Sequence, residues 1–123
     1  MAFTHLHVHT EYSLLDGSNK IKEYVDRVKE LGMDSAAITD HGVMYGVIDF
    51  YKEAQKQGIH PVIGCEVYVA PNSRFDKELT GGDDRYYHLV LLAENNTGYA
   101  NLMTEYLNIR QQQVFRLPEQ VSL

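Results

Sequence analysis

Two histidines near the amino end of the chain stand at a spacing that could bind a metal ion. His7 and His9 lie two residues apart in an alternating segment, residues 4–10, that predicts a β-strand. Alternate residues of a strand project from one face, so the two imidazoles can converge on one ion from Cα atoms about 6.5–7 Å apart. Imidazole is a very common metal ligand. The alternative is a polar strand face with two solvated histidines.

Acidic residues and a further histidine follow or interrupt two later predicted strands. Asp40 and His41 come directly after the apolar run at residues 35–39, at the carboxyl edge where α/β proteins place their sites. Asp40 has an equal alternative as the N-cap of the following helix. Glu66 interrupts the apolar strand predicted over residues 60–69, where an ionised carboxylate is costly unless it is paired or bound to metal. We therefore predict that Glu66 is a ligand.

The other candidate side chains carry weaker signals when each is taken alone. Asp16 lies in a Leu-Leu-Asp-Gly sequence, which indicates an ordinary Asp-Gly turn. His88 lies near the start of the strand predicted over residues 86–93, where a single histidine indicates a structural role. Three more residues are expected to lie outside any site. His5 is expected as a structural histidine near the other end of the sheet, His60 as an exposed residue, and Cys65 as a thiol packed beneath a helix.

Strands and helices alternate along the chain, and these elements must position the candidate ligands. Apolar residues at helical spacing predict helices over residues 21–31, 47–58 and 97–113. Strands are predicted over residues 4–10, 35–39, 60–69 and 86–93. This order predicts an α/β fold with a parallel sheet. About four strands cannot close a barrel of ordinary size, so either the sheet is open or the domain is incomplete. Residues 71–85, which contain a double glycine and no sustained periodicity, predict a long exposed loop that is the most mobile internal segment.

Composition and charge narrow the classes of function. The chain has 123 residues and 44% apolar residues, enough for one small domain with a core, and its net charge of −6 argues against a broad basic surface for duplex DNA. Phosphate chemistry would therefore need a local positive centre, which metal ions supply. The single cysteine favours a reducing compartment, and the absence of a signal peptide or a long apolar run predicts a cytoplasmic protein without a membrane partner.

Four segments, taken in order, resemble the amino-terminal PHP domain of bacterial DNA polymerase III α subunits. They begin with the His-Leu-His-Val-His run and end with a segment that resembles the replicative polymerases more than histidinol phosphatases: residues 5–17, 37–42, 63–69 and 88–102. The resemblance divides the chain into the amino-terminal portion of a PHP domain, residues 1–103, and a tail, residues 104–123, that does not follow the family pattern.

The resemblance implies a distorted seven-stranded β/α barrel, of which this chain would hold about the first four strands. Its carboxyl face would bind up to three divalent metal ions, zinc, manganese or iron. The positions that match the family's ligands are His7, His9, Asp16, His41, Glu66 and His88. Glu66 matches the carboxylate that bridges metals, and Asp40 matches the acidic residue beside His41. The resemblance implies that both residues are catalytic. The family's remaining ligands come from strands beyond this chain.

The function implied for the parent protein is DNA-directed DNA polymerisation in replication, with a phosphoesterase-type site that acts as a 3′–5′ exonuclease or a pyrophosphatase. The implied partners are DNA, the other polymerase III subunits and the remaining polymerase domains in cis. One alternative is a structural or docking domain with a non-catalytic metal, and another is a stand-alone phosphatase for a small phosphate ester. We expect the short chain alone to be inactive, and to self-associate through the free edge of its last strand.

Overall fold

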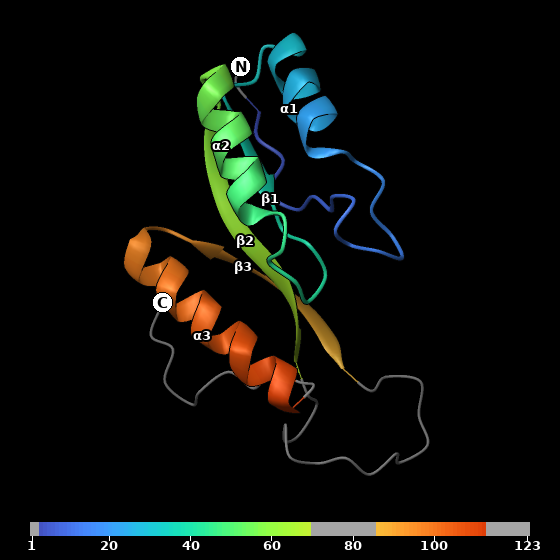
Figure 1. Cartoon of the computed structure of the whole chain (residues 1–123), viewed down its shortest axis with the longest axis vertical. Helices are drawn as coiled ribbons and strands as arrows, with labels where there is room; N and C mark the ends of the chain where they lie inside the picture. Colours follow the sequence, from blue (N-terminus) through green and yellow to red (C-terminus); the bar gives the residue numbers. More distant parts are fainter. Residues whose placement is uncertain (1–2, 70–85, 113–123) are drawn as a thin grey trace.

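The computed structural model describes residues 3–69 and 86–112, with side chains described as far as residue 104. Its strands form one sheet in the order β1-β2-β3. The strands are β1 (Ser35–Ile38), β2 (His60–Val69) and β3 (Tyr87–Ala93), and the helices are α1 (Ile21–Glu30), α2 (Val47–Gln57) and α3 (Asn96–Gln112). In Figure 1, α1 and α2 lie next to each other beside β1 and β2, while α3 runs along β3. The predicted α/β fold is confirmed.

The core forms where the helices cover one face of the sheet. Helix α1 buries Val25 and Val28, and α2 buries Phe50 and Ala54. These residues recur three or four positions apart, which places them on one side of each helix. They share a single cluster with Cys65, a residue of β2. Because neighbouring residues of a strand alternate, the next residue along β2 projects from the opposite face, away from the helices.

The register of the sheet aligns the candidate ligands. β1 and β2 are parallel, with Ile38 opposite Ile63. An isolated parallel bridge between His41 and Glu66 continues this alignment beyond the end of β1. The amide of Gly42 also donates to the carbonyl of Glu66 at 2.8 Å. The segment that follows β1 is therefore held beside the middle of β2.

Two expectations about the strands were wrong in detail. Residues 4–10 do not form a regular strand. Between this segment and the chain after β1, the described backbone–backbone hydrogen bond runs from the amide of Thr39 to the carbonyl of Val8 at 2.9 Å, while the amide of Val8 donates to the Thr39 hydroxyl. A side chain thus replaces the backbone partner that a ladder would need. β3 runs antiparallel to β2, not parallel to it. Antiparallel neighbours need no crossover helix, which fits the lack of helical periodicity between residues 71 and 85.

Some predictions fall on residues outside the described ranges. The loop expected over residues 71–85, with its mobility, lies entirely there, and so does the end of the tail, residues 113–123. Helix α3 runs without a break across the expected boundary between residues 103 and 104. Among the helices that the structure describes, none is long and apolar enough to cross a membrane.

Candidate metal centre

The amino-terminal segment is anchored so that its histidines face β2. The hydroxyl of Thr39 accepts from the amide of Val8 at 2.8 Å and donates to its carbonyl at 3.1 Å. Two residues further on, Thr10 donates its amide to Asp40 Oδ1 at 2.5 Å and its hydroxyl to Asp40 Oδ2 at 2.8 Å. These two contacts fix the segment on both sides of His9. The alternation between His7 and His9 then directs both rings to one side although no regular strand forms.

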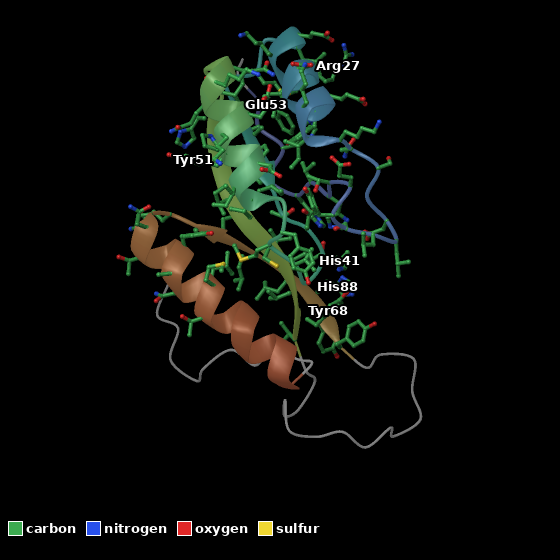
Figure 2. All side chains as sticks on the ribbon, in the orientation of Figure 1. Arg27, His41, Tyr51, Glu53, Tyr68 and His88 are labelled. Carbon is green, nitrogen blue, oxygen red and sulfur yellow. The ribbon has the colours of Figure 1, made fainter. Side chains whose placement is uncertain are left out.

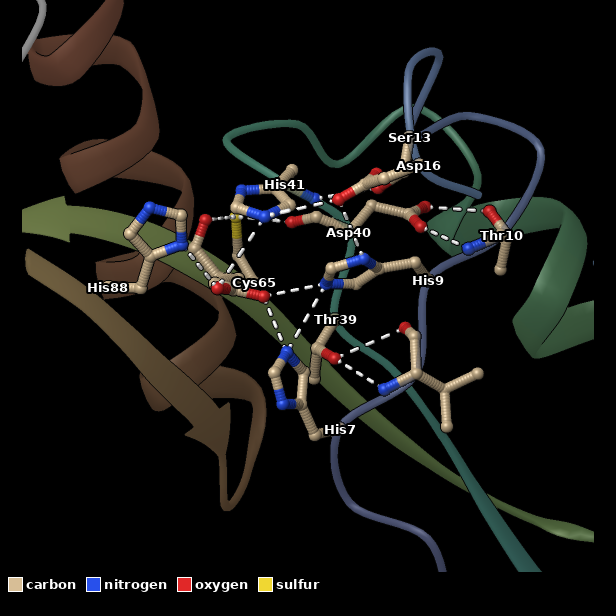
Figure 3. A network of polar contacts seen from close by, with 12 residues as sticks. His7, His9, Thr10, Ser13, Asp16, Thr39, Asp40, His41, Cys65 and His88 are labelled. Carbon is tan, nitrogen blue, oxygen red and sulfur yellow. Dashed lines mark hydrogen bonds and ion pairs between the residues drawn. The ribbon is translucent and has the colours of Figure 1, made fainter. Parts of the chain in front are cut away.

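Glu66 lies at the centre of the cluster and is only 4% exposed. Its Oε2 lies 2.5 Å from His7 Nε2 and 2.6 Å from His9 Nε2. Its Oε1 lies 2.7 Å from His88 Nδ1 and 3.6 Å from His41 Nε2. Figure 3 shows the rings of His7 and His9, His41 and His88, which come from three separate segments of the chain and point toward one another. The expected convergence of the first two histidines with Glu66 is confirmed.

The protonation of Glu66 reflects this environment. Burial by itself raises the pKa of a carboxylate, but hydrogen bonds with His7, His88 and His9 outweigh it and lower the pKa of Glu66 to about 2. The carboxylate is therefore ionised throughout the physiological range. An ionised carboxylate can use both oxygens as acceptors or as ligands.

Asp16 joins the cluster from a loop. Its Oδ2 lies 3.2 Å from both His9 Nδ1 and His41 Nε2. The loop is closed by backbone hydrogen bonds from the amides of Asp16 and Gly17 to the carbonyl of Ser13, at 3.0 and 2.8 Å. The hydroxyl of Ser13 also accepts from the amide of His41 at 2.8 Å, which ties this loop to the end of β1.

Six side chains thus form three overlapping groups, each with ligand atoms within 4.8 Å of one another: His7, His9 and Glu66; His9, Asp16 and His41; His41, Glu66 and His88. The second and third groups both need His41, whose Nε2 faces Asp16 and Glu66, while its Nδ1 is buried without a hydrogen-bond partner. One nitrogen cannot serve two ions. The described residues therefore offer two three-ligand groups with separate histidines, which have Glu66 in common and Asp16 on their flank.

The donor set suits a metal ion. His7 Nε2 and His9 Nε2 lie 3.2 Å apart, and both point at the same carboxylate oxygen. Imidazole nitrogens and carboxylate oxygens are the donors that zinc accepts in proteins, at about 2.0–2.2 Å. Every salt bridge that the structure gives within the cluster joins a histidine to a carboxylate, so these nitrogens and oxygens are not held by lysine or arginine.

Asp40 does not reach the cluster with its carboxylate. It is 1% exposed, and each of its oxygens accepts a hydrogen bond from Thr10. Helix α2 begins after Gly46, so the alternative reading of Asp40 as its N-cap was wrong. The geometry gives Asp40 a positioning role, and a catalytic role for it stays a prediction.

We predict that Asp40→Ala destabilises the chain by about 2–3 kcal/mol, because it leaves the buried amide and hydroxyl of Thr10 without acceptors. Asp40→Asn should cost about half as much, since the amide oxygen can still accept from the Thr10 amide while the amide nitrogen donates to the hydroxyl. Urea unfolding of the metal-free chain measures both values. Asp34→Ala, at an exposed position before β1, is the control. Equal midpoints for Asp40→Ala and the control would contradict the positioning role.

The remaining candidates lie outside the cluster. His60 is exposed as expected, and Cys65 is 1% exposed, with burial raising the pKa of its thiol to about 12. The thiol is therefore protonated and unreactive. His5, expected as a structural histidine near the other end of the sheet, is exposed, with its ring 4.7 Å from that of Phe3. The segment carries His5 outward because no ladder pairs it with β1.

Sequence reasoning missed the residues that hold the ligands in place. Thr39 and Ser13 make side-chain bonds to the backbone of the amino-terminal segment and of His41. Tyr68 packs its ring against His41, with centroids 5.6 Å apart and an interplanar angle of 24°. Its position two residues after Glu66, on the same strand face, is the one signal that could have indicated Tyr68.

Comparisons with known proteins identify the family to which the chain is similar. The family model described as "PHP domain" matches residues 5–116. The chain is 52% identical over 103 residues to "DNA polymerase III subunit alpha" of Treponema pallidum, covering 84% of this chain and 9% of the relative. It is 55% identical over 102 residues to the protein of the same name in Helicobacter pylori, covering 83% of this chain and 8% of the relative. The chain thus spans less than a tenth of the length of these relatives.

Two solved structures share the fold. An amidohydrolase from Chromobacterium violaceum, with bound sulfate and no metal, aligns with a TM-score of 0.61 and 24% identity over 89% of this chain and 34% of its own. A protein from Bifidobacterium adolescentis, described as a metal-dependent phosphoesterase, aligns with a TM-score of 0.59 and 19% identity over 88% of this chain and 33% of its own. At these identities the likeness establishes the fold alone. Both structures are about three times as long as the matched part.

Proposed function

The chain belongs to the PHP domain family, and from that premise we propose that its histidine and carboxylate cluster forms part of a metal-dependent centre that hydrolyses phosphoesters. One observation carries the proposal. The two oxygens of Glu66 face different histidines, with Oε2 towards His7 and His9 and Oε1 towards His88 and His41. A single carboxylate is thereby placed to bridge two ions, an arrangement that serves phosphoryl transfer in many two-metal enzymes.

The exposure of the ligands favours a catalytic centre over a structural one. The side chains of His7, His88 and Asp16 are 57%, 44% and 43% exposed. Structural metal sites are closed by protein ligands, whereas catalytic sites keep a position open to water or substrate. Three protein ligands per ion would leave such a position, and the exposed ligand side chains lie on the solvent side. The alternative of a docking domain with a non-catalytic metal gains no support from this geometry.

Each residue has a role that follows from its contacts. His7 and His9 would hold one ion and His41 and His88 the other, with Glu66 between them. Divalent ions held there would polarise phosphoryl oxygens and make hydroxide available near neutral pH. Glu66, ionised at that pH, keeps the negative charge that draws cations to the cluster. Asp16, 3.2 Å from two histidines, is placed to orient them or to complete a ligand set.

The parent function is proposed from the similarity to polymerase subunits. About half of the matched residues are identical to proteins named "DNA polymerase III subunit alpha". We propose that the chain is part of such a replicative DNA polymerase, with DNA, other polymerase subunits and polymerase domains in cis as partners. Removal of nucleotides from a 3′ end, or hydrolysis of pyrophosphate, is the activity proposed for the complete domain. Zinc, manganese or iron as the metal, a third ion, self-association and the cytoplasmic location stay predictions.

The test is metal binding followed by hydrolysis. We expect the 123-residue chain to retain about two zinc or manganese ions after dialysis, as measured by elemental analysis, and to cleave a single-stranded oligonucleotide slowly or not at all. Activity is expected to be low because the family's later ligands would be needed to fix each ion firmly. His60→Ala, which removes an exposed histidine outside the cluster, is the control and should bind the same number of ions.

Three outcomes bear on the proposal. A chain that retains no metal under these conditions would contradict the metal centre itself. Robust cleavage that is lost in both His9→Ala and Glu66→Ala would support the centre and show that the ligands of this chain suffice. Cleavage that survives both substitutions would come from another protein in the preparation.

A further inference from the structure

An aromatic cluster borders the candidate metal centre on one side. The ring of Tyr68 lies against His41, with centroids 5.6 Å apart, and meets His88 edge-on at 5.1 Å. Tyr86 in turn contacts Tyr68 edge-on, at 4.8 Å and 71°, and stacks on His88 at 5.7 Å and 30°. Figure 2 shows Tyr68 next to His41 and His88 at one end of the sheet. Both tyrosines therefore contact His88, one of the imidazoles that face Glu66.

The sheet register puts these rings on the site side. Tyr68 is the cross-strand partner of His88 in the antiparallel pair of β2 and β3. Because side chains alternate, Tyr86 shares the face of His88, and Tyr87 projects from the opposite face. Tyr86 is 45% exposed and Tyr87 is 58% exposed. The two neighbouring tyrosines are thus similarly accessible, but only Tyr86 lies beside the metal centre.

The contacts of Tyr86 hold its ring while leaving much of it accessible. Tyr68 supports it edge-on, with ring centroids 4.8 Å apart. An accessible aromatic face is what unpaired bases use for stacking on proteins. The ring of Tyr86 contacts His88, a ligand of the proposed phosphate-binding ions, with centroids 5.7 Å apart. A base stacked on Tyr86 would therefore lie next to the ions that would hold the phosphate of the same nucleotide.

We propose that Tyr86, supported by Tyr68, is a stacking subsite for the base of a nucleotide whose phosphate is bound at the metal centre. This inference rests on the proposed function and adds a specificity-determining residue to it. The substrate class is an unpaired nucleotide or a single-stranded end, since a base inside a duplex cannot present its face to a side chain. A sugar phosphate without a base would reach the ions but gain nothing from Tyr86.

The test compares two small probes on the zinc-loaded 123-residue chain. Isothermal titration calorimetry gives dissociation constants for thymidine 5′-monophosphate and for 2-deoxyribose 5-phosphate, which differ by the base alone. We expect the nucleotide to bind about tenfold more tightly, the lower part of the range for one stacked base. Tyr86→Ala should reduce that ratio to about one while leaving the affinity for the sugar phosphate unchanged, which also shows that the variant is folded. Tyr86→Phe should keep the ratio, because the ring does the stacking.

Tyr87→Ala is the matched control, since it removes an equally accessible tyrosine from the other face of β3 and should leave the ratio intact. Equal affinities of the unsubstituted chain for the two probes would overturn the stacking subsite and leave the proposed phosphoester function standing. A similar loss of the ratio in Tyr87→Ala and Tyr86→Ala would also overturn it. If neither probe binds the zinc-loaded chain, both the subsite and the proposed function are wrong.

Discussion

Glu66→Gln is expected to lower the affinity of the chain for zinc or manganese by more than about a hundredfold. Loss of an outer-shell partner alone costs about 10–100-fold in metal affinity, and Glu66 is placed to contact two ions directly. The substitution keeps the size of the side chain but removes its negative charge from the centre of four histidines. Equilibrium dialysis with elemental analysis measures the loss as a fall in bound ions from about two to less than one.

The control for this prediction is a carboxylate on the far side of the fold. Glu53 is half-buried on α2 and accepts from Gln57 at 2.7 Å, outside every group that could hold a metal among the described residues. Glu53→Gln should bind the same number of ions as the unsubstituted chain. If Glu66→Gln keeps two ions at unchanged affinity, the carboxylate does not bridge them, and the assignment of the centre is wrong.

Gly17→Ala is expected to destabilise the folded chain by about 3 kcal/mol, the upper part of the range for overpacking in a closed space. A Cβ at Gly17 would overlap the carbonyl oxygen of Thr10 and lie 2.9 Å from the Cβ of Ser13. The first of these neighbours is backbone, so it cannot turn aside as a flexible side chain could. The reason is steric, because the backbone of Gly17 is not in the left-handed region.

The same substitution should also weaken metal binding, because the loop that must shift carries Asp16. Gly98→Ala in α3 is the matched control: its Cβ would make an ordinary 3.5 Å contact with Ala93, and alanine in a helix is favoured over glycine by about 0.5–1 kcal/mol. Urea unfolding should therefore move the two midpoints in opposite directions. Equal urea midpoints for Gly17→Ala and Gly98→Ala would mean that Gly17 does not pack closely against Thr10 and Ser13.

The helices and one buried carboxylate could be predicted from short stretches of the sequence. Apolar residues every three or four positions predict α1 and α2 correctly, because burial of one helix face imposes that period on the sequence itself. Gly58 marks the end of α2 with a φ of 75°, a conformation that glycine adopts without strain. Glu66 was also predictable, since a carboxylate inside an apolar strand must find a partner.

Other features depend on contacts between distant segments. The alternation of residues 4–10 is typical of a strand, but whether a ladder forms depends on what lies alongside, and there the Thr39 hydroxyl takes a backbone bond. The direction of β3 depends on its connection to β2, which carries no periodic signal. Asp40 shows the same limit, because its sequence position fits a ligand or a cap while its buried oxygens bond to Thr10.

The sequence by itself determined the helices, the three strands of the sheet, the paired histidines and the buried carboxylate, because each leaves a pattern within a few neighbouring residues. Only the tertiary structure decided which side chains meet. Asp16 in a turn and His88 on a strand have no local mark of a site, and the resemblance to a family, not their spacing, indicated them. They reach the cluster because a loop closed on Ser13 and the register of β2 with β3 place them there. Such placement arises from hydrogen bonds between segments far apart in the chain, and no local period encodes those.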